Sequence, residues 1–539
     1  MIRGKVKTRI SIIFLCALVI FGCILGKLGY EQIFHHTDIM EKALDLWERD
    51  FTVAGLRGSI LDKQGKVLAH DIPSTSVMVV PAQIKHPDET AKQLAQVLNA
   101  DEKTIKTKIT KHVSTQKIQP EGRLISDEKA RKLEAMDLEG VYLVQDSLRN
   151  YPNNNYLAQV LGFTGIDNQG LAGLELQYND ILSAKSGGLN IPFDAKGHKV
   201  ELYQETYEAP GRGMDVQLTI DAKIQDIVER EMNNLMKRYH PKSALALAMN
   251  PQTGEVLAMV SKPDFDPNHY KDYSSDVYNR NLPIWKSYEP GSTFKSVIFA
   301  SGLELKLYDM FKDTYDDKGY EMVGGARIKS WKAGGHGHQT FLQVLENSSN
   351  PGFVEISRRM GLDREYEYVT KFGFGQKTGI DLPGESKGIM FKKEVMGELE
   401  QATVAFGQGL SVTPIQLVTA FSAVVNGGTL YTPYITKSIN DPITHDPILE
   451  FKPTKKRQVI SEETSKLMRY ALESVVANGG GKPAYMEGYK IGGKTGTAQI
   501  AENGVYSTSN YILSFLSAAP IDDPQIVLYI AADSPQNDI

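Results

Sequence analysis

Ser292 and Lys295 have the types and the spacing of a nucleophile and its base. Apolar residues at helical spacing follow them as far as Leu305, whereas Pro290 and Gly291 are tolerated only before or at the start of a helix. We therefore expect a helix whose first turn contains Ser292, with Lys295 on the same face and within reach. That turn also directs free backbone N–H groups and the positive end of the helix dipole toward a developing oxyanion.

A serine hydroxyl becomes a good nucleophile when a base takes its proton, and a lysine can act as that base only in its neutral form. The pKa of Lys295 must therefore fall from its usual value of ~10.4, through burial and a nearby positive charge. Lys494 can supply that charge. Taken alone, a Ser-x-x-Lys pattern is more often a capping serine and a solvated lysine, so this interpretation depends on partner motifs.

Ser348-Ser349-Asn350 is the first partner motif, and it follows a stretch, residues 341–347, that has a helical pattern. Ser348 can relay a proton between one of the two lysines and a leaving amine. The side-chain amide of Asn350 can both donate to and accept from a substrate amide. The alternative is a turn or a helix N-cap, because serine and asparagine are residues that caps use.

The second partner motif lies in residues 491–500, which have the pattern of a strand opened by two glycines. The period of a strand puts Thr495 and Thr497 on one face, where their hydroxyls can hold a carboxylate with Lys494 as the counter-charge. Gly496 would let a substrate backbone pack close, as in strand addition. The backbone N–H of Thr497 is a candidate second oxyanion donor beside that of the nucleophile.

Four other features could carry chemistry. Lys377–Gly379 repeats the Lys-Thr-Gly pattern but leads into a turn rather than a strand, so Lys494 is preferred. His336 and His338 supply two metal ligands where a catalytic metal needs three, and we interpret them as part of a loop near the site. Glu385 could activate water, although an exposed glutamate is the commoner outcome. The short basic run Lys455–Arg457 is interpreted as a solvated loop.

The composition describes an ordinary globular protein with a sizeable core. The chain has 539 residues, 41% hydrophobic and 23% charged, and dividing by ~150 residues per domain suggests ~3 units. Its net charge of −5 gives no indication of a nucleic-acid partner. Cys16 and Cys23 are its only cysteines, so neither a disulfide framework nor a cysteine-based metal site is available.

Ile10–Gly26 is uncharged and just long enough to cross the hydrocarbon core of a bilayer. The positive-inside rule places the N-terminus in the cytoplasm and the rest of the chain outside, because basic residues precede this stretch at Arg3, Lys5, Lys7 and Arg9. A cleaved signal peptide or a lipoprotein signal ending at Cys23 is the alternative, but the small residues that either needs are lacking. We therefore expect an uncleaved anchor, followed by a helix over Thr37–Asp50.

Local patterns predict further elements. Residues 57–69 read as a strand, a polar turn and a second strand, and therefore as a hairpin. Val216–Ile220 alternates as a strand does, and Asp221 can cap the helix that follows it. Ala244–Met249 and Val256–Val260 are apolar strands joined by a turn, which predicts the start of an antiparallel sheet.

The three motifs, in this order, resemble those of the class B penicillin-binding proteins, and the resemblance extends over most of the chain. The anchor, residues 57–69 and Arg149–Pro152 look like the non-catalytic pedestal of that family. Residues 244–260, Thr378–Glu385 and Phe406–Gly409 look like its transpeptidase domain. Within the family the chain is most similar to the septal and sporulation (stage V, protein D) type.

The resemblance implies a mixed α/β (α+β) fold in which helices flank an antiparallel sheet, with an elongated N-terminal pedestal and one transmembrane helix. The domains implied are a cytoplasmic tail (1–9), an anchor (10–30), a pedestal or dimerisation domain (31–220) and a transpeptidase domain (221–539). The last of these is expected to lack the helix that normally closes the family's sheet.

The resemblance also implies the chemistry. Ser292 would form the acyl-enzyme with Lys295 as its base, Ser348 and Asn350 would form the second motif, and Lys494 with the two threonines would bind the substrate carboxylate. The donor would be a D-alanyl-D-alanine stem peptide and the acceptor an amine on a neighbouring strand, and β-lactams would acylate the serine. No metal or cofactor is expected. A membrane glycosyltransferase and division or sporulation proteins are the expected partners.

Two other classes of function stay open at this point. A D,D-carboxypeptidase or β-lactamase would hydrolyse the same acyl-enzyme, and the sequence separates it poorly from a transpeptidase that acts in division or in spore cortex synthesis. A scaffold or β-lactam sensor would bind without turnover. The long pedestal and the anchor favour the transpeptidase, and the intact motifs argue against a degenerate scaffold.

Overall fold

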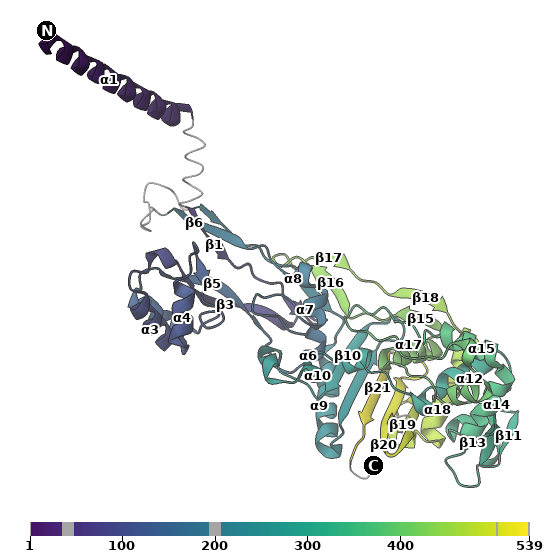
Figure 1. Cartoon of the computed structure of the whole chain (residues 1–539). Coiled ribbons are helices and arrows are strands. Elements are labelled where there is room, and N and C mark those ends of the chain that lie inside the picture. Colours follow the sequence, from purple (N-terminus) through teal and green to yellow (C-terminus); the bar gives the residue numbers. More distant parts are fainter. Residues whose placement is uncertain (1, 35–47, 193–205, 503–504, 537–539) are drawn as a thin grey trace. The chain divides into compact units, whose positions relative to one another are not determined.

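The computed structural model describes residues 2–34, 48–192, 206–502 and 505–536, and these form two compact units (Figure 1). Unit 1 comprises Met1–Leu56, Pro73–Leu148 and Lys185–Gly211. Unit 2 comprises Arg57–Ile72, Arg149–Ala184 and Arg212–Ile539. Each unit is therefore assembled from three separate stretches of chain, whereas the predicted boundary near residue 220 divides the chain only once.

Helix α1 (Ile2–Phe34) contains the expected anchor. Its segment Lys7–Phe34 is long and apolar enough to cross a membrane, and none of that segment's apolar window is buried against protein. It is therefore a candidate membrane span. The helix expected over residues 37–50 falls largely outside the described residues, and its last part belongs instead to strand β1 (Glu48–Val53).

Unit 1 has a small apolar core of its own, to which the later part of β3 contributes Val77 and Val79 and the helices contribute residues such as Leu94, Ile105 and Leu133. Two of its helices, α4 and α5, begin at side-chain caps: Asp101 accepts from the backbone N–H of Thr104, and Ser126 accepts from that of Lys129. Its other elements are α3 (Pro87–Leu98), α4 (Glu102–Ile109), β4 (Gln116–Lys117), α5 (Asp127–Met136), β5 (Val141–Asn150), β6 (Gly187–Pro192) and β7 (Thr206–Glu208).

The centre of unit 2 is an antiparallel sheet of five strands in the order β10-β9-β21-β20-β19. The predicted pair is present, because β9 and β10 lie antiparallel with Ala246 opposite Val260. The C-terminal strand β21 lies between β9 and β20, and β19 is left at the edge. The strands are β9 (Ser243–Met249), β10 (Val256–Lys262), β19 (Gly492–Glu502), β20 (Val505–Ala519) and β21 (Ile526–Asp533).

Helices cover both faces of this sheet at β9 and β10, so these two strands are buried along nearly their whole length, whereas β21 alternates between buried and partly exposed residues (Figure 1). The even-numbered alanines of β9 pack with α9 (Ala222–Tyr239), whereas Leu245 and Leu247 belong to the larger core on the other side. There α17 (Pro414–Val425) is buried on every side. The other helices of this unit that surround the site are α12 (Lys295–Glu304), α13 (Phe341–Glu346), α14 (Asn350–Met360), α15 (Leu362–Lys371), α16 (Glu398–Val404) and α18 (Glu462–Asn478).

A second sheet of unit 2 confirms the other local predictions. Strand β2 (Ile60–Leu61) pairs antiparallel with the start of β3 (Val67–Val79), which is the expected hairpin, and parallel with β8 (Asp215–Leu218). Asp221 caps α9 by accepting from two backbone N–H groups. The remaining elements of unit 2 are α6 (Ala158–Leu161), α7 (Gly173–Gln177), α8 (Asn179–Leu182), α10 (Ser275–Tyr278), α11 (Leu282–Trp285), β11 (Thr314–Asp317), β12 (Tyr320–Val323), β13 (Ala326–Lys329), β14 (Gly337–Thr340), β15 (Thr429–Thr432), β16 (Thr436–Asn440), β17 (Pro447–Glu450) and β18 (Thr454–Gln458).

Glu175 holds the separate stretches of unit 2 together. Its carboxylate accepts from Arg57 Nε at 2.6 Å and from Arg149 Nε at 2.7 Å, and all three side chains are almost fully buried. Arg149 also donates to the carbonyl of Gly58 and pairs with the buried carboxylate of Asp71 at 3.2 Å. These contacts join residues 57–72 to residues 149–184, so the Glu175 side chain fixes the positions of these two stretches relative to each other.

We expect Glu175→Ala to destabilise unit 2 by about 3–5 kcal/mol, because it leaves two buried guanidinium groups without their shared carboxylate. The free energy of unfolding can be measured by urea titration of the full-length protein. Asp276→Ala is the matched control, since it removes the partner of an exposed ion pair with Arg280 and should leave stability near wild type. Equal effects of the two substitutions would contradict the role assigned to Glu175.

Candidate active site

Ser292 lies in a short 3-10 turn, Gly291–Thr293, that leads directly into α12. The serine is partly exposed, whereas every residue of α12 from Lys295 to Leu303 is buried. Thr293 fixes the turn from within, because its hydroxyl donates to the carbonyl of Pro290 at 2.7 Å. The turn thus leads into an enclosed helix and leaves the side chain of Ser292 partly exposed at the start of the predicted helix.

The loop of residues 405–412 packs against the turn Gly291–Thr293. Gly291 has a φ of +56° and donates its N–H to the carbonyl of Gly407 at 3.1 Å. A Cβ at Gly407 would lie 2.1 Å from the carbonyl oxygen of Gly291, so only glycine allows this approach. Tyr288 and Val412 exchange two backbone hydrogen bonds at the base of the contact.

Glu289 ties three segments together beside the nucleophile. Its Oε1 accepts from the N–H of Gly409 at 2.9 Å and from the hydroxyl of Tyr506 on β20 at 3.1 Å. Burial raises the pKa of this carboxyl above its usual value. Nothing in the local sequence around Glu289 indicates this contact, because both of its partners are distant in the chain.

Lys295 meets the second motif. Its Nζ donates to the carbonyl of Ser348 at 2.7 Å, to the hydroxyl of the same serine at 3.1 Å and to Oδ1 of Asn350 at 2.6 Å. Its side chain is fully buried and lies over the ring of Phe353 at 5.2 Å. Three oxygen atoms thus fix the position of the amine at the centre of the site.

The second motif adopts an unusual backbone conformation that serves this contact. Ser348 has a φ of +52°, a left-handed conformation that is uncommon for a residue with a side chain. It turns both its carbonyl and its hydroxyl toward Lys295. Ser349 supplies the N-cap of α14 instead and donates to the buried carboxylate of Asp317 at 2.8 Å. The cap reading of this motif therefore applies to its middle residue.

The third motif, Lys494–Thr497, lies in strand β19, and a strand was predicted here. This strand is at the edge of the sheet. Lys494 is fully buried, Thr495 is half-buried and Thr497 is exposed. A Cβ at Gly496 would lie 2.8 Å from Cγ2 of Thr293 and closer still to a side chain on β20. The missing side chain therefore makes room for the protein's own nucleophile turn, a structural task that the sequence analysis did not anticipate.

Two buried amines dominate the electrostatics of the site. Burial lowers the pKa of Lys295 far below its ordinary value, and the positive charge of Lys494 lowers it further. Burial also lowers the pKa of Lys494, to about 7. Among the described residues neither lysine forms an ion pair, and Lys494 donates only to the carbonyl of Thr495, at 3.1 Å. The sequence analysis named both causes, and burial is the larger one.

The structure therefore brings the predicted residues into one site. Lys295, Ser348 and Asn350 are joined by hydrogen bonds, and Lys494 is close enough to change the pKa of Lys295. The turn that carries Ser292 packs on β19, where its flanking residues meet residues 496–498.

Three predictions about neighbouring features are wrong. Glu385 is buried rather than exposed, because its carboxylate accepts from the backbone N–H and the hydroxyl of Thr378, both at 2.5 Å. His338 lies in strand β14 rather than in a loop. Lys455–Arg457 lies in strand β18, paired with β15, rather than in a solvated loop. Lys377–Gly379 is irregular, as expected.

Asp317 and Trp331 are the other residues near the second motif that sequence reasoning missed. Asp317 accepts from Ser349 and Ser330 and from the N–H of Gly319. Trp331 is 70% exposed and donates its indole N–H to the carbonyl of Asn347 at 2.7 Å. An isolated aspartate carries no local signal, whereas an exposed tryptophan next to a polar motif could have been noticed only with the fold in hand.

Comparisons with known proteins agree with this geometry. Residues 244–538 match the penicillin binding protein transpeptidase domain, and residues 52–218 match the penicillin-binding protein dimerisation domain. The chain belongs to the penicillin-binding protein transpeptidase family. The predicted resemblance is thereby confirmed, as is the mixed α/β transpeptidase fold with an N-terminal dimerisation domain.

Individual penicillin-binding proteins extend the comparison over almost the whole chain. Stage V sporulation protein D of Bacillus subtilis (strain 168) is 50% identical and aligns with 99% of this chain and 83% of its own length. The peptidoglycan D,D-transpeptidase FtsI homolog of Mesostigma viride is 29% identical, over 98% of this chain and 92% of its own. The crystal structure of penicillin binding protein 2X from Streptococcus thermophilus superposes with a TM-score of 0.74 at 24% identity and covers 91% of this chain and 78% of its own.

We expect Gly407→Ala to slow labelling by a fluorescent penicillin more than tenfold, because the new Cβ would displace Gly291 and with it the nucleophile turn. Gly384→Ala is the matched control. Its φ of +85° imposes a similar backbone strain of about 1–2 kcal/mol, but no atom lies within 4 Å of its Cβ. Similar labelling rates for the two variants would show that strain alone, and not displacement of the turn, is responsible.

Proposed function

We propose that this chain is a peptidoglycan D,D-transpeptidase that acts through an acyl-enzyme on Ser292. The observation that carries the proposal is the burial of Lys295, which favours the neutral form of its amine. This amine contacts Ser348 and Asn350, and Lys295 follows the nucleophile by one helical turn. Membership of the family and the names of the relatives, a peptidoglycan D,D-transpeptidase among them, point to the same reaction.

In the first half of the reaction, Ser292 Oγ attacks the carbonyl carbon of the penultimate D-alanine of a stem peptide, and its proton passes to the neutral amine of Lys295. The backbone N–H groups of Ser292 and Thr497 would hold the oxyanion. The C–N bond then breaks, and the terminal D-alanine leaves with a proton relayed by Ser348. The products of this half are a serine ester and free D-alanine.

In the second half, the amine of a neighbouring stem peptide attacks the ester carbonyl. The amine gives up one proton to the same lysine–serine relay, and Ser292 Oγ leaves and recovers it. A peptide bond thus replaces a peptide bond, so the reaction needs no external energy source and no redox group. Ser348 suits the relay because its hydroxyl contacts the amine of Lys295 and can both donate and accept a hydrogen bond.

The third motif is assigned to the substrate carboxylate. Thr495 and Thr497 share one face of β19, and Lys494 lies beside them as a buried cation with no carboxylate partner among the described residues. A bound carboxylate would raise the pKa of Lys494 and hold its charge in place. Asn350 is assigned to the peptide amide of the donor. Gly496 has no side chain to cover the strand edge, and it leaves room for the turn that carries Ser292.

The membrane arrangement follows from the candidate span. We infer that residues 1–9 lie in the cytoplasm, because four basic residues precede the apolar part of α1, and that the chain after Tyr30 lies on the opposite side of the membrane. A role in spore or septal wall synthesis is favoured by the relative that is 50% identical, a stage V sporulation protein. A membrane glycosyltransferase and division or sporulation proteins stay proposed partners.

Labelling with fluorescent penicillin tests the nucleophile. The full-length protein should form a stable adduct, whereas Ser292→Ala should form none at an unchanged unfolding midpoint. Ser287→Ala is the control. Ser287 lies shortly before the turn in the chain, and the variant should label normally. Release of the adduct within minutes would support the hydrolase instead, and no adduct on folded wild type would support a scaffold.

The acylation rate of the free protein should decrease as the pH rises through about 7, because Lys494 then loses the charge that attracts the ligand carboxylate. Burial and the charge of Lys494 lower the pKa of Lys295 as well, but loss of its proton frees the base and would increase the rate, so a decrease is assigned to Lys494. Lys494→Arg keeps its charge at every accessible pH, so its rate should lack this decrease even if it is lower overall. A decrease of the same shape in both proteins would contradict the assignment.

A further inference from the structure

Two basic motifs that the transpeptidase reaction does not use meet in unit 2. The second Lys-Thr-Gly sequence, Lys377–Gly379, follows α15, and the basic run Lys455–Arg457 lies in β18. They are joined directly, because Nζ of Lys456 donates to the carbonyl of Thr378 at 2.5 Å. Neither motif belongs to the site around Ser292, so their meeting needs a separate explanation.

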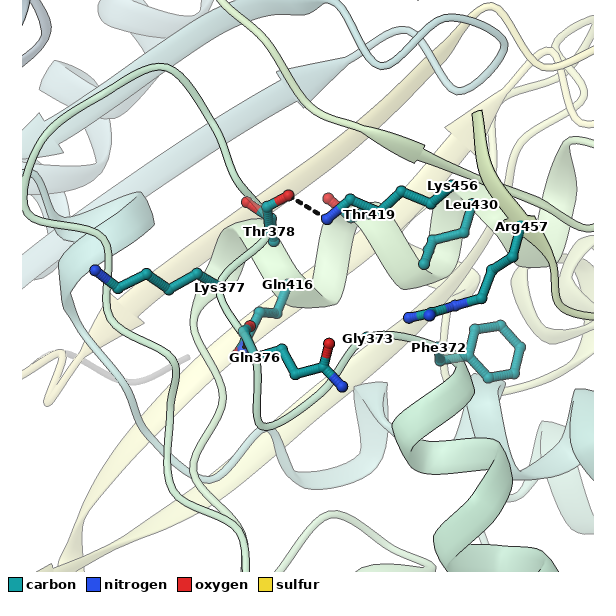
Figure 2. Close-up of a pocket in the computed structure, with 10 residues that line it drawn as sticks. All are labelled: Phe372, Gly373, Gln376, Lys377, Thr378, Gln416, Thr419, Leu430, Lys456 and Arg457. Atoms are coloured by element: carbon teal, nitrogen blue, oxygen red, sulfur yellow. Dashed lines mark hydrogen bonds between the residues drawn. The ribbon is translucent and has the colours of Figure 1, made fainter. Parts of the chain in front are cut away.

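A pocket opens where these motifs meet (Figure 2). It encloses about 20 Å³, and Phe372 and Leu430 supply apolar wall on one side. In Figure 2 the guanidinium of Arg457 and the side-chain amide of Gln376 extend toward one another across the pocket, whereas Lys377 extends away from it. None of the ten lining residues is acidic.

Three polar side chains of this pocket have donor groups with no hydrogen-bond acceptor among the described residues. Arg457 uses Nε to donate to the carbonyl of Lys371 at 2.8 Å, and no hydrogen bond within the described part of the chain engages its two terminal nitrogens. The side-chain amide of Gln376 has no partner there either. Thr419 is 6% exposed, and its hydroxyl is buried with no hydrogen-bond partner among the described residues. A buried hydroxyl left in this state is unfavourable unless something else fills the role.

Glu385 supplies a negative charge that acts on Lys456, but within the described part of the chain its oxygens form no hydrogen bond with Lys456 or Arg457. Glu385 is committed to the loop itself, since its two oxygens accept from the backbone of Thr378 and Gly379 and from the Thr378 hydroxyl. The loop is held from the other side by Gln416, which donates to the carbonyl of Gln376 at 2.6 Å. The pocket is therefore a fixed concavity whose free groups can give hydrogen bonds and whose charge is positive.

We propose that this pocket binds a phosphate group. The cavity has room for about one water-sized atom, so one phosphate oxygen enters it and accepts from Thr419, while the others stay at the mouth with Arg457 and Lys456. A guanidinium binds two oxygens of such an anion at once, which is the arrangement that its terminal nitrogens leave free. Donors that converge from three elements suit a tetrahedral anion better than a planar carboxylate. A bound phosphate would link the loop after α15 to β18.

The test is calorimetric titration of the full-length protein with sodium phosphate, against sodium chloride at matched ionic strength. We expect saturable phosphate binding by wild type, and at least about tenfold weaker binding by Arg457→Ala, because a charge-assisted pair of hydrogen bonds is lost. Lys455→Ala is the matched control. It removes the same charge from the same strand, but Lys455 does not line the pocket, so affinity should change little.

Thr419→Val keeps the test decisive if Arg457→Ala folds poorly. It removes the unpartnered hydroxyl without breaking any hydrogen bond of the described protein, so the unfolding midpoint without phosphate should be equal to or above that of wild type. Phosphate affinity should nevertheless fall several-fold. Wild-type binding no stronger than that of chloride, or binding unchanged in both variants, would overturn the proposal.

The phosphate could be a free ion or part of a phosphodiester polymer, and both present the same oxygens. Titration with poly(glycerol phosphate) at equal phosphate concentration distinguishes them. Equal affinity per phosphate indicates a site for the free ion, and tighter binding of the polymer indicates a site for a chain, provided that Thr419→Val weakens either. Penicillin labelling of Ser292 should be unaffected by these substitutions, so the outcome is independent of the proposed transpeptidase reaction.

Discussion

The burial of two lysine amines in one site, with no carboxylate partner in the part of the chain that the structure describes, is the constraint on which the rest of this structure depends. Water is the best solvent for an ammonium ion, and removing it favours the neutral amine. Lys295 is enclosed by the fully buried helix α12 and by the second motif, and Lys494 by the edge of the central sheet. Packing by the helices and the sheet thus favours the neutral amine, which can accept a proton, over the ammonium form of a solvated lysine.

Unusual backbone conformations gather around the same amine. Ser348 is left-handed, and Gly291 and Gly407 approach each other in a contact that no side chain would permit. Such positions are stable only where the surrounding structure holds them, here the cap of α14 and the two hydrogen bonds between Tyr288 and Val412. The strain is local and lies where atoms must be placed accurately, while the pedestal elements of unit 2 are fixed by an ordinary buried ion pair at Glu175.

The sequence was sufficient for features whose signals are local. Spacing identified Lys295, the period of a strand identified the face shared by Thr495 and Thr497, and Asp221 marked the start of α9. It was insufficient where the deciding partner is distant. Glu385 looked like a surface residue because nothing nearby shows that Thr378 would fold back on it, and β21 gave no sign that it would lie between β9 and β20. The joining of residues 57–72 to residues 149–184 within unit 2 depends in the same way on Arg57 and Arg149 meeting one glutamate.

The position of β19 at the margin of the sheet has a further consequence. A marginal strand has backbone groups without a neighbouring strand, and any extended segment of suitable length can pair with them. The accessibility that the proposed binding of a stem peptide requires would therefore also admit strands of other proteins or of a second molecule. Most sheets blunt such margins with charge, bulges or a covering helix. A protein whose activity requires an exposed edge strand cannot use those protections there, so this edge remains a site of possible unwanted association.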